Sequence, residues 1–164
     1  MNLSGHFAGS TDTPLTDEGR QQAKKAGQLA KDLNIDYIIC SPLSRAQETA
    51  QIIARSIGYP KKEIHINNLF TERHFGELEG TVWAPDMNLD GISDIETVDD
   101  LLERANLALQ FIENLDKHHI LIVSHGSFGR AIRSLIIPQH PYTNKTSNPD
   151  DKDKLSNAEI HNWI

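Results

Sequence analysis

The chain has 164 residues, of which 38% are hydrophobic and 24% are charged, an ordinary composition for one globular domain over residues 1–164. The formal net charge of −7 argues against nucleic acid and anionic membranes as partners. No apolar run is long enough to span a membrane, and the single cysteine, Cys40, excludes an internal disulfide, so we expect a cytoplasmic protein.

The first half of the chain predicts two helices and two short strands. Residues 1–15 are polar and rich in glycine and predict a loop. Thr16 is a helix cap, and alanine and leucine residues follow it at helical spacing as far as Leu33. The next predicted elements are a buried strand over residues 37–40, a helix over 43–57 and a strand over 64–66.

The second half predicts a long loop, two helices and two strands. Residues 71–96 lack a clear periodicity and predict mostly loop. The apolar stripe of the third helix consists of Leu101, Ala105, Ala108, Ile112 and Leu115. The remaining predicted elements are a strand over residues 119–124, a helix over 127–137, a loop over 138–153 and a last strand over 158–164.

Strands that alternate with helices indicate an α/β fold with a mainly parallel sheet and helices on both faces. In such sheets ligands bind beyond the carboxyl ends of the strands. That edge collects residues 41–45 and 124–126. An unpaired edge of the sheet would also allow strand-mediated pairing into a homodimer.

Ser124-His125-Gly126 places a histidine where a predicted strand ends and a helix begins. Gly126 allows a ligand to approach the backbone, and the helix offers free N–H groups to an anion. The alternative is a loop histidine that bonds to a neighbour. The histidines of the chain show no zinc-type spacing, so we expect no metal and no cofactor.

Two further charged residues are candidates for the same edge. Arg45 lies near the start of the second helix and can bind phosphate oxygens through its forked guanidinium; the alternative is a surface ion pair with Glu48 or Glu18. Glu72 precedes a glycine-rich turn that also contains Glu77 and Glu79, and a carboxyl group there can act as a general acid. The alternative is a solvated acidic turn.

Four stretches in this order, GSTDTPLTDEGRQQA, SPLSRAQETA, FTERHFGELEG and LIVSHGSFGRAI, resemble the histidine phosphatase superfamily, whose members are phosphoglycerate-mutase-like. The resemblance implies a three-layer α/β sandwich with a mixed, mostly parallel sheet and helices on both faces. It also implies an enzyme that transfers a phosphoryl group to a histidine and then to water or a second hydroxyl. It implies that Arg45 clamps the phosphate, Glu72 protonates the leaving oxygen and His125 binds phosphoryl oxygens. The residues expected to bind phosphate or substrate are Asn2, Gly9, Gly126 and Phe75.

The resemblance also implies a first, central strand that ends in Arg-His-Gly, whose histidine takes the phosphoryl group. No Arg-His-Gly occurs in the sequence, and Asn2 already matches the loop beyond that motif. We expect an N-terminally truncated form of a normal enzyme that is inactive as written. The alternative is a degenerate relative that binds phosphate without turning it over.

The stretch over residues 80–97 favours a phosphomonoesterase over a phosphoglycerate mutase. Mutases of the family carry added cations after the Glu72-type motif to hold a second phosphate group. Here the stretch has no lysine or arginine, and its acids are Asp86, Asp90, Asp94 and Glu96. We therefore expect a small phosphorylated substrate with one phosphate group. A nucleotide-binding α/β domain is disfavoured, because no glycine-rich phosphate loop follows a predicted strand.

Overall fold

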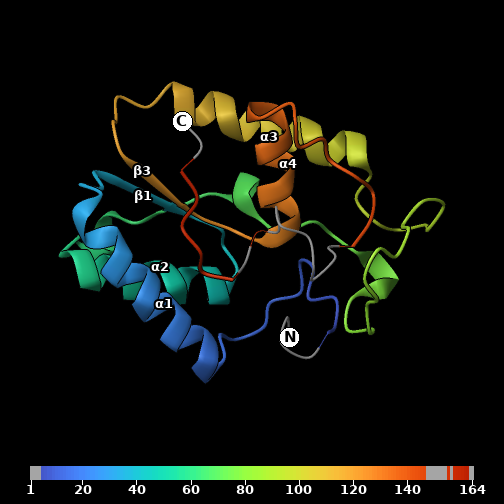
Figure 1. Cartoon of the computed structure of the whole chain (residues 1–164), viewed down its shortest axis with the longest axis horizontal. Helices are drawn as coiled ribbons and strands as arrows, with labels where there is room; N and C mark the ends of the chain where they lie inside the picture. The colour runs from blue at the N-terminus through green and yellow to red at the C-terminus, as the bar shows by residue number, and fades with distance from the viewer. Residues whose placement is uncertain (1–4, 147–154, 156, 163–164) are drawn as a thin grey trace.

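A parallel three-stranded sheet lies between two pairs of helices in the computed structural model, which describes residues 5–146, 155 and 157–162 (Figure 1). The strands are β1 (Tyr37–Cys40), β2 (His65–Ile66) and β3 (Ile120–Val123), in the order β2-β1-β3. β1 pairs in parallel with both neighbours, and its Tyr37 lies opposite Ile120. The expected α/β fold is confirmed. The expected sheet is mixed and mostly parallel; among the described residues its strands pair only in parallel, and the antiparallel pairings are isolated bridges.

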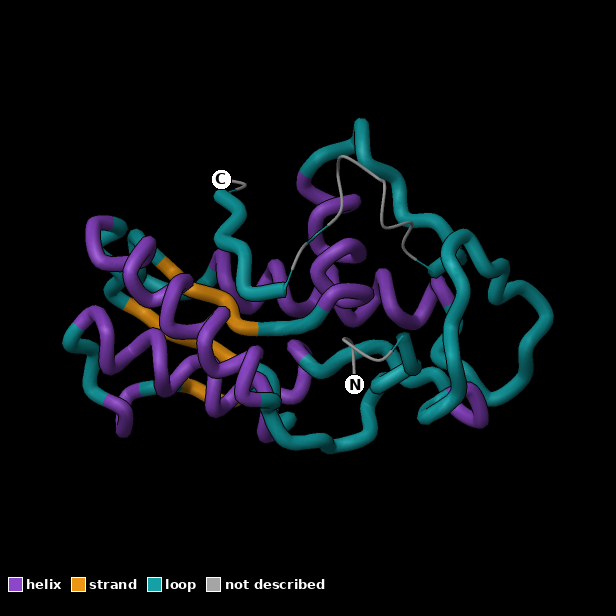
Figure 2. The backbone as a smooth tube through the Cα atoms, turned by 60° about the horizontal axis from the view of Figure 1, so that its bottom comes forward, coloured by secondary structure: helices purple, strands orange, loops and turns teal. Residues whose placement is uncertain are grey.

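Helices cover both faces of this sheet (Figures 1 and 2). α1 (Asp17–Leu29) and α2 (Ser44–Ile57) pack on one face, against Ile38, Cys40 and Val123. α3 (Val98–Glu113) and α4 (Gly126–Ile136) pack on the other face, against Ile39. Successive side chains of a strand point to opposite faces, so the apolar run of β1 supplies both layers of the core.

The helix starts follow local signals in the sequence. The Thr16 hydroxyl accepts a hydrogen bond from the Gly19 amide at 3.0 Å, as expected for the cap of α1. Thr97 caps α3 in the same way, through the Asp100 amide. α2 ends at Gly58, whose left-handed φ of 74° is typical of a glycine that closes a helix. α1 is shorter than predicted, because a 3₁₀ turn (Ala30–Asp32) replaces its last turn.

The described N-terminal segment is tied to the loop that follows residue 75. The Phe7 amide donates to the Thr81 carbonyl at 2.9 Å, and the Gly80 amide donates to the Phe7 carbonyl at 2.7 Å. The rings of Phe7 and Phe75 pack with centroids 5.0 Å apart in a small separate core with Leu89. This pairing positions residues 9–11 beside the carboxyl edge of the sheet.

The last predicted strand is wrong over its described part. Residues 158–162 form a turn and irregular backbone, and residues 163–164 lie outside the described residues. Ala158 and Ile160 instead pack against the core between the sheet and the α1–α2 layer. Their apolar character therefore serves packing rather than strand pairing, which needs a neighbour with free backbone groups. No helix in the described part of the chain is long and apolar enough to cross a membrane.

Candidate phosphate site

His125 lies at the carboxyl end of β3, directly before α4, and faces the adjacent strand end. Its Nε2 atom lies 2.7 Å from the hydroxyl oxygen of Ser41, which follows β1. The two residues come together because β1 and β3 are neighbours in the sheet, with Cys40 opposite Val123. One ring nitrogen of His125 is thus bonded to a neighbouring residue, as the alternative interpretation of this histidine expects.

Arg45, in the first turn of α2, turns towards the N-terminal segment. Its Nη2 group donates to the Gly9 carbonyl at 2.7 Å, and its Nη1 group donates to the Thr11 carbonyl at 2.9 Å. The predicted alternative of an ion pair with Glu48 is not what the structure shows, because the Glu48 carboxylate binds Arg20 at 2.6 Å. The charge of Arg45 therefore has backbone carbonyls as its hydrogen-bond partners.

Glu72 is held by backbone amides and is not a solvated acidic turn. Its Oε1 atom accepts from the amides of Arg73 at 2.8 Å and Phe128 at 3.0 Å, and its Oε2 atom accepts from the Ser127 amide at 3.1 Å. Two of these donors belong to the first turn of α4, where the helix dipole favours a negative charge. The carboxyl group is thereby fixed at the start of α4, the helix that His125 directly precedes.

The three predicted residues lie at one edge of the sheet, close enough for electrostatic interactions between them. Burial lowers the pKa of Arg45, and the carboxylates of Glu72, Asp12 and Glu79 act in the opposite direction. Burial lowers the pKa of His125 to about 3, and the positive charges of Arg45 and Arg104 lower it further. At neutral pH the imidazole of His125 is therefore neutral and lies near the positive charges of Arg45 and Arg104.

Arg104 of α3 is part of this site, although its sequence context gives no sign of it. Its Nη1 group donates to the carbonyls of Leu69 and Thr71 at 2.8 Å each, and its Nη2 group pairs with Glu96 at 2.7 Å. The guanidinium also lies 4.7 Å from the centre of the Phe128 ring. Arg104 thus holds the backbone directly before Glu72 and adds positive charge near His125.

Glu72 is one member of a closed ring of hydrogen bonds. Glu72 accepts from the backbone of Arg73 and Ser127, and the Ser127 hydroxyl lies 2.8 Å from the Tyr142 hydroxyl. Tyr142 in turn accepts from Arg73 Nη1 at 3.2 Å. Arg73 is 1% exposed and also donates to the side chain of Asn144. The loop after α4 therefore braces the candidate acid, a link that no local pattern of the sequence predicts.

The other predicted binding residues have varied surroundings. Gly9 has a left-handed φ of 51°, its carbonyl accepts from Arg45, and a β-carbon there would overlap the Glu79 carboxylate. Gly126 is exposed, with open space beside its α-carbon. Phe75 is 8% exposed and belongs to the core cluster with Phe7. Asn2 lies outside the described residues.

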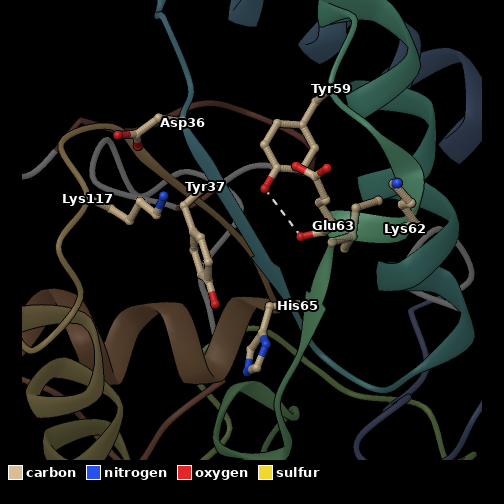
Figure 3. Close-up of a pocket in the computed structure, with 8 residues that line it drawn as sticks. Asp36, Tyr37, Tyr59, Lys62, Glu63, His65 and Lys117 are labelled. Atoms are coloured by element: carbon tan, nitrogen blue, oxygen red, sulfur yellow. Dashed lines mark hydrogen bonds between the residues drawn. The ribbon is translucent and has the colours of Figure 1, made fainter.

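A cavity of about 350 Å³ lies at the opposite edge of the sheet. Tyr37 and His65, which begin β1 and β2, line it together with Tyr59, and Lys62 and Lys117 flank it (Figure 3). These residues precede or open the strands, so the cavity is separate from the edge that carries His125. Within residues 5–146, 155 and 157–162, no group of three or more His, Cys, Asp or Glu side chains is placed to hold a metal ion.

Comparison with known proteins gives a consistent result. Residues 1–160 match the model of the histidine phosphatase superfamily (branch 1). The chain is 34% identical to phosphoglycerate mutase-like protein 4 of Arabidopsis thaliana, over 88% of this chain and 68% of that protein. It is also 34% identical to the uncharacterized phosphatase PhoE of Bacillus subtilis, over 82% of this chain and 69% of that protein.

Solved structures share the fold. The open reading frame Rv3214 from Mycobacterium tuberculosis superposes with a TM-score of 0.68 at 30% identity, over 83% of this chain and 73% of that one. YhfR from Bacillus stearothermophilus superposes with a TM-score of 0.75 at 22% identity, over 96% of this chain and 93% of that one. The α/β fold expected from the sequence is confirmed by these neighbours.

Proposed function

Because the chain belongs to the histidine phosphatase superfamily, we propose that Arg45, Glu72 and His125 form the phosphoryl-binding site of a phosphomonoesterase. The observation that carries this proposal is the meeting of three distant motifs at the carboxyl edge of the sheet, where the charge of Glu72 acts on Arg45 and the charge of Arg45 acts on His125. The ligand is a small molecule with one phosphate group.

In the proposed reaction a histidine nitrogen attacks phosphorus while the bond from phosphorus to the leaving oxygen breaks. Glu72 gives its proton to that oxygen, and water then releases inorganic phosphate from the phosphohistidine. Arg45 binds the phosphoryl oxygens, where negative charge must be stabilised.

Residues 1–164 contain no candidate for the nucleophile at the family's position, since Arg-His-Gly does not occur in them. We propose that residues 1–164 by themselves bind phosphate esters without turning them over, and that the phosphomonoesterase activity needs the histidine of that motif. His125 does not replace the missing histidine, because the role that the family assigns to it is beside the reaction axis, and displacement needs attack in line with the leaving oxygen.

A phosphatase is favoured over a mutase by the charges of the loop before α3. The stretch over residues 80–97 contains no lysine or arginine. Glu96 pairs with Arg104, and the Asp90 carboxylate accepts from Asn144 at 2.7 Å. Arg104, the cation beside Glu96, is thus already engaged, and a second substrate phosphate beside this stretch would meet mostly negative charge.

The test compares binding with turnover in residues 1–164 purified free of host phosphatases. We expect inorganic phosphate to bind in calorimetry and p-nitrophenyl phosphate to remain intact. Turnover that is lost in His6→Asn would contradict the missing nucleophile. The genomic DNA before the Met1 codon gives a second test: an in-frame apolar strand that ends in Arg-His-Gly supports a complete phosphatase, whereas a stop codon supports a binding protein.

A further inference from the structure

Glu79 gathers hydrogen-bond donors from two segments that are far apart in the sequence. Its Oε1 atom accepts from the Ser10 amide at 2.8 Å and from the Phe75 amide at 3.0 Å. Its Oε2 atom accepts from the Thr11 amide at 2.8 Å, and the hydroxyls of Ser10 and Thr11 also donate to the carboxylate. The side chain is only 10% exposed, so these bonds fix the short loop over residues 9–11.

The same short loop provides the partners of Arg45. The carbonyls of Gly9 and Thr11 accept from the two Nη groups of Arg45, while the amides of Ser10 and Thr11 donate to Glu79. The loop thus lies between the carboxylate and the guanidinium, and its peptide groups connect the two side chains. Within the described part of the chain these two carbonyls are the hydrogen-bond partners of the Arg45 side chain, and a guanidinium has further N–H groups that can bind an anion.

Gly9 makes this arrangement possible. Its φ of 51° is a conformation that glycine adopts without strain, and a β-carbon at this position would overlap the Glu79 carboxylate. The loop is also fastened at its far end, where Asp12 accepts from the Ser44 amide and hydroxyl at 2.8 Å each. Ser44 opens α2 and precedes Arg45, so the loop is held relative to the helix that carries the arginine.

We propose that Glu79 is a positioning residue for Arg45: by fixing the loop over residues 9–11, it orients the guanidinium towards the phosphate. This inference rests on the proposed phosphate-binding function of Arg45. If the loop were not held, Arg45 could sample other rotamers. Phosphate binding would then have to order the Arg45 side chain, and the lost conformational entropy would weaken the affinity. Glu77, in the 3₁₀ turn (Gly76–Leu78) directly before Glu79, is exposed and has no part in this arrangement.

The test is a double-mutant cycle in the full chain, with inorganic phosphate as the calorimetric probe. Glu79→Gln keeps the size of the side chain but places an amide group where two backbone N–H groups need acceptors. We expect a phosphate affinity about tenfold weaker, the effect of losing one oriented hydrogen bond to the anion. In the Arg45→Ala background the same change should have no further effect. Glu77→Gln, the matched control, should bind phosphate like the unchanged chain.

Equal phosphate affinity in Glu79→Gln and the unchanged chain would overturn the proposal, as would full additivity with Arg45→Ala. Side-chain NMR of Arg45 gives a readout that needs no ligand. Its Nη protons should exchange slowly in the unchanged chain and fast in Glu79→Gln; unchanged exchange overturns the proposal. A chain that binds no phosphate, but shows this loss of protection, refutes the phosphate site and leaves the positioning of Arg45 supported.

If Glu79→Gln does not fold, the double change Ser10→Ala and Thr11→Val takes its place. It removes the two hydroxyl donors to Glu79 and keeps the backbone amides. A smaller loss of phosphate affinity, with faster exchange at Arg45, is expected. Unchanged affinity and exchange in this variant would overturn the proposal.

Discussion

The Nε2 atom of His125 lies 2.7 Å from the hydroxyl oxygen of Ser41, across the carboxyl ends of two neighbouring strands. The contact ties the orientation of the imidazole ring to the sheet itself. Burial and the nearby charges of Arg45 and Arg104 keep this ring neutral, with a pKa of about 3. A neutral ring that is bonded through Nε2 can present its Nδ1 side to a ligand.

The charge state of His125 should change when an anion binds. In the free chain, we expect imidazole NMR signals of a neutral ring at every pH between about 5 and 8. A bound anion stabilises the imidazolium, so vanadate or phosphate should raise the pKa of His125 and binding should take up protons. A free ring that titrates near its ordinary value would contradict the burial described for this residue.

His125 should also shape the acid sensitivity of the fold. Its folded pKa of about 3 lies below its ordinary value of 6.5, so the unfolded chain binds the proton first as the pH falls. The contribution to the free energy of unfolding is therefore complete above about pH 6.5 and is lost progressively towards pH 3. Urea unfolding at several pH values should show a flatter dependence in His125→Asn. An identical dependence in both chains would show that His125 does not titrate in this way.

Glu72→Gln should weaken both the fold and any turnover. The carboxamide cannot accept from all three backbone amides that Glu72 binds, so we expect a loss of about 1–3 kcal/mol in the free energy of unfolding. In an active, full-length form the loss of turnover should be largest for poor leaving groups, which need the proton most. The control is Glu77→Gln, at an exposed glutamate. Equal losses for good and poor leaving groups would show that Glu72 only binds or orients.

Tyr142→Phe tests the hydrogen-bond ring around Glu72. The change removes the hydroxyl that contacts Ser127 and accepts from the buried guanidinium of Arg73. We expect a destabilisation of about 1–2 kcal/mol, because the buried Arg73 Nη1 group loses one of its two acceptors and keeps only Asn144. Tyr59→Phe is the control, since the Tyr59 hydroxyl donates to the Glu63 carbonyl at an exposed site. Equal unfolding free energies for the two variants would argue against the ring.

Gly76→Ala should be more damaging than Gly58→Ala, although both glycines have a positive φ. A β-carbon at Gly58 meets no atom within 4 Å, so that variant bears only the backbone strain, about 1 kcal/mol. A β-carbon at Gly76 would overlap the carbonyl of Asp94, which must move. Thermal unfolding of the two variants measures the difference. Similar midpoints would mean that the loop over Asp94 yields easily.

Local patterns in the sequence were enough to predict the core elements. The cap at Thr16, the strand over residues 37–40 and the apolar stripe with Leu101 and Ala105 depend on neighbours along the chain, and all are present. The last strand fails because strand formation depends on a distant partner. Ala158 and Ile160 satisfy the apolar pattern by packing against the core instead.

The candidate site also has one part that the sequence predicts and another part that it does not. Arg45, Glu72 and His125 stand out in the sequence because their motifs carry them, and the order of the strands brings them to one edge. Their supporting residues are absent from any such motif. Arg104 holds the backbone before Glu72 from a different helix, and Tyr142 reaches it from the loop after α4. These contacts join segments that are far apart in the sequence, so no local pattern predicts them.

Calorimetric titration of inorganic phosphate into the unchanged chain, Arg45→Ala and Arg20→Ala tests the central claim most directly. Arg20 is a surface arginine paired with Asp17 and Glu48, and its loss should leave binding unchanged. We predict binding to the unchanged chain and to Arg20→Ala, and an affinity at least about tenfold weaker in Arg45→Ala. Equal affinities in all three chains, or no binding to the unchanged chain, would contradict a phosphate site at the carboxyl edge of this sheet.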